Sequence, residues 1–110
     1  MKTYRFVIRA VPSSNNRYRE HLQSGIGHVY VFAEDAVSAE QIAHAYMLKH
    51  DWIPTTVEHA FEIQPQQLLD LDKDEALLYQ RAQRLGVAAD IVTVPVAGSR
   101  LADPLSDHLS

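Results

Sequence analysis

The stretch of sequence that decides the fold is residues 29–52, VYVFAEDAVSAEQIAHAYMLKHDW. It begins with five apolar or aromatic residues, so neither face of the strand expected over residues 28–33 is polar. Ser38 and Gln41 match the capping box, in which two side chains satisfy backbone amides at a helix start. We therefore expect a helix over residues 38–50. Its apolar side would consist of Ala39, Ile42, Ala43, Tyr46 and Met47.

Three further strands are expected over residues 3–11, 55–63 and 90–95, which show apolar alternation or short apolar runs. In the first, Tyr4, Phe6, Ile8 and Ala10 would share one face and Arg5, Val7, Arg9 and Val11 the other. In the second, Val57, His59, Phe61 and Ile63 would share a face, with Glu58, Ala60 and Glu62 opposite. Residues 12–27 are rich in turn-forming residues and predict a long exposed connection.

A second helix is predicted from residue 72. Acidic side chains gather in its first turn, where the helix dipole favours them, and Gly86 stands where a helix commonly ends. Its buried side would consist of Leu78, Ala82 and Leu85. A single helical turn is expected before it, at residues 65–69, because proline is favoured in a first turn.

The predicted elements alternate between strands and helices after the first two strands. Two helices can cover only one face of four strands, so we expect an α+β fold. Its architecture would be a two-layer ferredoxin-like sandwich, with a four-stranded sheet and two helices on one face. The length of 110 residues fits one domain, expected over residues 1–96. Residues 97–110 would form a flexible tail or an arm that reaches a partner subunit through Leu101, Leu105 and Leu109.

Composition excludes several classes of function. The absence of cysteine excludes disulfides, zinc–thiolate sites and a cysteine nucleophile. A net charge of −4 argues against binding to nucleic acid, which depends on basic side chains. Arginines interrupt the apolar residues at the N-terminus, so no signal peptide is expected, and no apolar run is long enough for a membrane span. We therefore expect a cytoplasmic protein with no membrane or nucleic-acid partner.

Three segments are similar to small bacterial ferredoxin-like domains without an assigned activity. These segments are residues 29–52, VEHAFEI at 57–63, and DEALLYQRAQRLGVAADIVTV at 74–94. The similarity covers roughly residues 28–95 and includes the small-residue helix, the aromatic residue after it and the acidic start of the second helix. It implies a fold, and it carries no catalytic residue over to this chain.

One face of a two-layer sheet would be bare, and its strands are not polar enough to face water. Contiguous exposed apolar surface usually marks an interaction site. We therefore expect a homodimer, or another protein partner, with Arg5 and Arg9 facing Glu58 and Glu62 across the interface. The expected interface residues are Val7, Val11, Tyr30, Phe32, Leu101, Leu105 and Leu109.

Charge is distributed unevenly along the chain. Residues 1–19 contain five basic side chains and no acid, whereas residues 20–75 contain eleven acids and two lysines. One interpretation is that these groups pair within the fold. The other is a site for an anion or an acidic partner, for which the candidates are Arg5, Arg9, Arg17, Arg19 and Tyr30.

None of the six histidines stands in a metal-binding spacing, so we expect neither a metal nor a cofactor. Glu40 and His44 would lie on one helix face, where an exposed ion pair is the simpler interpretation. His59 and His28 are the candidate catalytic bases, because histidine exchanges protons near neutral pH. For both, packing with satisfied nitrogens is the alternative.

Two functions are compatible with these features. The first is a non-catalytic interaction or regulatory module, similar to an adaptor or an immunity protein, that self-associates through the open sheet face. The second is a small dimeric enzyme or ligand binder with a pocket that contains His59 or His28. A deep cavity around His59 with a carboxylate partner would favour the second.

Overall fold

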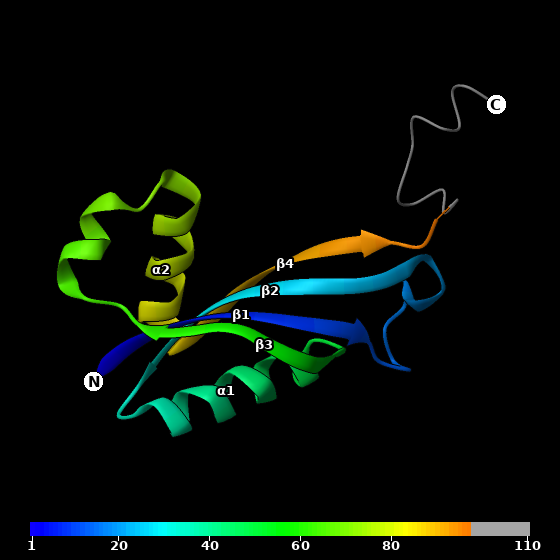
Figure 1. Ribbon diagram of the computed structural model, residues 1–110, viewed down its shortest axis with the longest axis horizontal. Helices are drawn as coiled ribbons and strands as arrows, with labels where there is room; N and C mark the ends of the chain where they lie inside the picture. Colours follow the sequence, from blue (N-terminus) through cyan, green and yellow to red (C-terminus); the bar gives the residue numbers. More distant parts are fainter. Residues whose placement is uncertain (98–110) are drawn as a thin grey trace.

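Four strands form one antiparallel sheet, and two helices pack against it (Figure 1). The computed structural model describes residues 1–97. The elements are β1 (Lys2–Pro12), η1 (Arg19–His21), β2 (Leu22–Ala33), α1 (Ala36–Lys49), β3 (Trp52–Glu62), η2 (Pro65–Asp70), α2 (Lys73–Leu85) and β4 (Val87–Pro95), where η denotes a short 3-10 helix. The α+β class predicted from the sequence is confirmed.

The strand order is β3-β1-β2-β4, and every pair of neighbours is antiparallel. The chain therefore runs ββαβαβ, whereas a ferredoxin-like domain runs βαββαβ, so a ferredoxin-like topology is not confirmed. β1 and β2 form a long hairpin whose register runs from Lys2 opposite Ala33 to Ala10 opposite Gly25. The exposed connection predicted over residues 12–27 is wrong in its second half, because β2 already begins at Leu22.

Two glycines inside β2 explain why the sequence there looks like a loop. A Cβ atom on Gly25 would lie 2.7 Å from a ring carbon of Trp52, and one on Gly27 would lie 2.8 Å from the sulfur of Met47. Both glycines are buried, and each makes room for a large side chain that lies across the sheet. They therefore serve packing within a strand.

The two helices lie on opposite faces of the sheet, as Figure 1 shows. Ala39, Ala43 and Met47 of α1 pack in the larger core. The strand residues of this core include Tyr4, Phe6, Ile8, Ala10, Val29, Val31 and Ala33. The smaller core joins Leu78 and Ala82 of α2 to Tyr30, Ile63 and Ala88. The prediction of both helices on one face is therefore wrong.

The reason lies in β2, where alternate apolar residues serve different helices. Val29 and Val31 belong to the α1 core, whereas Tyr30 belongs to the α2 core. An apolar strand without alternation is typical of a strand that is covered on both faces. Near Tyr30 the structure is therefore three layers thick.

The helix ends follow local hydrogen bonding. α1 begins after Asp35, whose carboxylate accepts a bond from the Ser38 amide at 2.8 Å, so the cap predicted at Ser38 is three residues late. These contacts with Ser38 hold the pKa of Asp35 below its ordinary value. α2 is capped by Asp72 and ends at Gly86, where φ is +90°, as its sequence predicts. Leu85, expected in the buried side of α2, is instead exposed.

Two irregularities in β3 change which side chains share a face. Val7 lies opposite His59 and Ile8 opposite Val57, so Glu58 is an extra residue in the ladder. Thr55 is extra in the same way between Thr56 and Pro54. The prediction that Val57 and His59 share a face is therefore wrong, because a period of two cannot anticipate a bulge.

α2 covers only one end of its sheet face. Beyond it, apolar side chains of all four strands lie on this face, and no element within residues 1–97 covers them. We call this set the uncovered strip: Val7, Val11, Ile26, Ile53, Val92 and Val94. Val92 is 56% exposed and Ile53 43% exposed. Glu62 does not belong to this face, because it lies opposite Tyr4 on the α1 side.

The packing of β2 predicts different effects for two glycine substitutions. Gly25→Ala is expected to lower the free energy of unfolding by about 1–3 kcal/mol, because the buried Trp52 ring must move. Gly27→Ala is the matched control and is expected to cost less, because the flexible end of Met47 can yield. Urea unfolding of both variants measures the difference. Equal stability of Gly25→Ala and wild type would contradict this packing.

Candidate functional site

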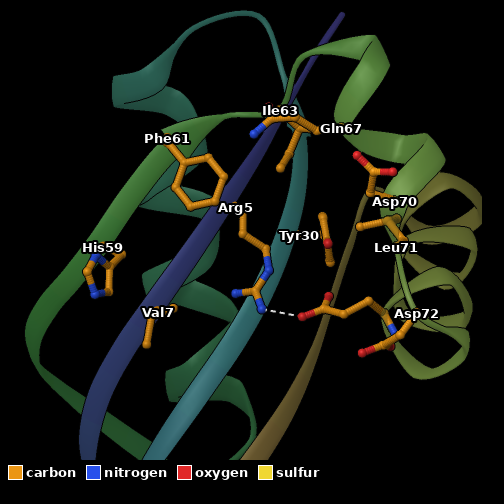
Figure 2. Close-up of a pocket in the computed structure, with 11 residues that line it drawn as sticks. Arg5, Val7, Tyr30, His59, Phe61, Ile63, Gln67, Asp70, Leu71 and Asp72 are labelled. Carbon is orange, nitrogen blue, oxygen red and sulfur yellow. Dashed lines mark hydrogen bonds and ion pairs between the residues drawn. The ribbon is translucent and has the colours of Figure 1, made fainter.

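A cavity of about 520 Å³ opens on the α2 side of the sheet, between β3 and the segment that leads into α2. Its floor includes Arg5 and Val7 of β1 and Tyr30 of β2. His59 and Phe61 of β3 line one side, as Figure 2 shows. η2 and the start of α2 form the other side, so this cavity depends on how α2 is held over the sheet.

Arg5 is the central polar group of the cavity, although only 9% of the residue is exposed. The alternation of β1 places it on the α2 side, between the buried residues Tyr4 and Phe6. Its Nη2 atom donates to Oε1 of Glu75 at 2.5 Å, and Nη1 donates to the carbonyl of Phe6 at 3.2 Å. The guanidinium carbon lies 5.2 Å from the centre of the Tyr30 ring, a cation–π distance.

His28 contacts the same arginine from the neighbouring strand. Its Nδ1 atom lies 3.2 Å from Nη2 of Arg5. A guanidinium can only donate, so in this contact Nδ1 is an acceptor and the ring proton of the neutral histidine is on Nε2. His28 thus lies within a strand and orients Arg5, and the sequence interpretation that placed it at the mouth of its strand is wrong.

Tyr30 is almost fully buried beneath α2. Burial is the main cause that raises its pKa to about 12, and the nearby Glu75 carboxylate adds to the rise while Arg5 opposes it. Its ring packs edge-on against Tyr79 at 5.8 Å, with an interplanar angle of 81°. At neutral pH the hydroxyl is therefore a neutral group.

Within residues 1–97, only one of the two carboxylate oxygens of Glu75 has a hydrogen-bond partner. Oε1 accepts from Arg5, whereas Oε2 is buried and has no hydrogen-bond partner in the part of the chain that the structure describes. The Tyr30 hydroxyl is close enough to influence this carboxylate, but it forms no hydrogen bond of normal geometry with Oε2. Oε2 is itself closed off from solvent, so only Oε1 of this carboxylate has a defined partner in the described chain.

Two of the four N-terminal arginines pair with acids within the described chain, so the interpretation of internal pairing is met in part. Arg5 pairs with Glu75, and Nε of Arg9 lies 2.9 Å from Oε1 of Glu58. Arg17 and Arg19 are exposed at the other end of the β1–β2 hairpin, so the five candidates for an anion site do not converge. Glu75 was interpreted from the sequence only as a helix-start acid, because no local pattern links residues 70 positions apart.

The other predicted site residues are dispersed. His59 is exposed on the cavity wall, and within residues 1–97 it forms no ion pair or hydrogen bond with a carboxylate. Phe32, expected at a partner interface, packs beneath α2 with its ring 5.5 Å from that of Tyr79, and Tyr30 is likewise covered. Val7 and Val11 remain on the uncovered strip. Leu101, Leu105 and Leu109 lie outside the described residues.

Within residues 1–97, no group of three or more histidine or acidic side chains is arranged to hold a metal ion. No helix in the same range has the length and apolar character needed to cross a membrane.

Residues 1–97 thus form an α+β domain with one helix on each face of an antiparallel sheet and a largely apolar cavity, with a few charged groups, beside the second helix. No family model, no curated protein and no solved structure matches the chain.

The raised pKa of Tyr30 predicts a loss of stability in alkali. Between about pH 10 and 12 the unfolded chain has released this proton and the folded chain has not, so the free energy of unfolding falls as pH rises. A difference of about two pKa units corresponds to about 2–3 kcal/mol over that range. Tyr30→Phe is expected to reduce the fall by this amount in urea unfolding measured at several pH values. An identical pH dependence in both proteins would contradict the assignment.

Proposed function

We propose that this protein is a non-catalytic interaction module that self-associates through the uncovered strip. The observation that carries the proposal is the strip itself, which exposes apolar side chains from four adjoining strands. A soluble antiparallel sheet normally has polar residues on an uncovered face. An apolar patch with a polar rim is instead typical of a protein interface.

The charges around the strip favour a second copy of the same chain as the partner. Arg9 is paired with Glu58, and Arg81 is paired with Asp90 at 3.1 Å. These two basic side chains are therefore neutralised by acids of the same chain. A two-fold interface brings a surface against itself, so a face of balanced charge avoids the repulsion that a charged face would meet.

Self-association can be tested by sedimentation velocity over a range of protein concentrations. We expect wild type to form a dimer and Val92→Lys to weaken it by about tenfold or more, because an ammonium group would be buried in the interface. Lysine is chosen because Asp74 and Asp90 lie near this position, so the folded monomer tolerates the added positive charge. Leu48→Lys is the matched control, since Leu48 is also 56% exposed but lies on α1, on the opposite side of the sheet.

A wild-type chain that stays monomeric at the highest accessible concentration would overturn the proposal. So would a Val92→Lys variant that dimerises as well as Leu48→Lys. In the first case a different protein would have to be sought as the occupant of the strip.

The second candidate function is binding of a small ligand in the cavity beside α2. Its volume of about 520 Å³ and its mixture of apolar walls with buried polar groups favour this function. His59 faces the cavity without a carboxylate partner in the described chain, so the geometry supports binding more than base catalysis. His28 would act on such a ligand only through Arg5.

A further inference from the structure

The chemistry of the cavity beside α2 indicates which ligands it accepts, an inference that rests on the second candidate function. Arg5, the cation on its floor, already has hydrogen-bond partners within the chain. Arg5 donates to Glu75, to the Phe6 carbonyl and to His28, and its face lies against Tyr30. An anionic ligand would have to compete with Glu75 for this guanidinium.

Acceptors without donors remain around Arg5. Three carboxylates line the cavity, those of Asp70, Asp72 and Glu75, against one guanidinium. Asp72 accepts from the Glu75 amide at 2.8 Å as the cap of α2. Asp70 has no ion pair within residues 1–97, and Oε2 of Glu75 is buried without a partner. The lining of the cavity therefore has a surplus of negative charge.

The remaining walls are apolar and aromatic. Phe61 is 45% exposed beside Val7, and Leu71 lies on the α2 side of the cavity. An aromatic face attracts a cation, and apolar walls favour a hydrocarbon body. The positive end of α2 would disfavour a cation, but Asp72, Asp74 and Glu75 lie at that end and offset it.

We propose that this cavity binds a small organic cation, an ammonium group attached to an apolar or aromatic body. The ammonium lies between the carboxylates of Asp70 and Glu75, and the body lies against Phe61 and Val7. An ammonium has three donors, which suits a site that offers acceptors. The ion is organic because no described set of side chains could hold a metal ion.

The experiment uses three probes of similar size that differ in charge: 2-phenylethylamine, phenylacetate and 2-phenylethanol. Binding of each to the full chain is followed by amide chemical shifts in NMR titrations at millimolar probe concentrations. We expect the amine to bind most tightly, with shifts that centre on Tyr30, Phe61 and Glu75. Phenylacetate is expected to give no saturable shift there.

Two variants test which carboxylate attracts the amine. Asp70→Asn is expected to weaken amine binding about fivefold, the effect of losing one partly exposed ionic contact. Asp74→Asn is the matched control. It also removes one negative charge, but Asp74 lies in the first turn of α2 and does not line this cavity. It is expected to change the affinity much less. Neither variant touches the Arg5–Glu75 pair, so both should fold.

The outcomes separate the two levels of the proposal. Tighter binding of phenylacetate than of the amine would overturn the cationic ligand class and leave the cavity as a ligand site. Absence of saturable binding by all three probes would overturn the ligand site as well. Equal weakening by Asp70→Asn and Asp74→Asn would mean that the amine responds only to the net charge of the protein, which also overturns the assignment.

Discussion

The ion pair between Arg5 and Glu75 is the contact on which the α2 side of the molecule depends. Two side chains of α2 are buried, Leu78 and Ala82, and the half-buried Tyr79 packs against Tyr30 and Phe32. A nearly buried guanidinium needs a partner, because an uncompensated charge at such a position is strongly destabilising. Glu75 supplies that partner at the first turn of the helix. The pair thereby fixes where α2 begins over the sheet, and with it the burial of Tyr30 and the width of the cavity.

The two faces of the sheet are closed in different ways. On one face, α1 approaches closely because Ala39 and Ala43 are small and because Gly25 and Gly27 leave room for Trp52 and Met47. On the other face, α2 covers one end only. Both the cavity and the uncovered strip follow from this partial cover, so the two proposed functions concern neighbouring parts of one incompletely closed surface.

Periodicity in the sequence indicated the existence of four strands and two helices and the buried side of β1, but not the bounds of every strand. It failed where the cause is not local. The glycines of β2 resemble a loop until Trp52 and Met47 are placed across them, and the bulge at Glu58 inverts the facing of Val57. The partnership of Arg5 with Glu75 joins residues 70 positions apart, so no spacing in the sequence indicates it. The apolar run in β2 indicated a strand that is covered on both faces. The prediction of one covered face was instead drawn from the number of helices.

The irregular backbone of β3 also limits how molecules of this protein can join edge to edge. Within residues 1–97 the sheet has two unpaired edges, β3 and β4, and an endless fibre would need both edges to pair with neighbouring molecules. β3 carries Pro54, which has no amide hydrogen to donate, and two extra residues that interrupt its ladder. Pairing of β4 with β4 is then the arrangement that the edges allow. It is symmetric, and it closes after two molecules.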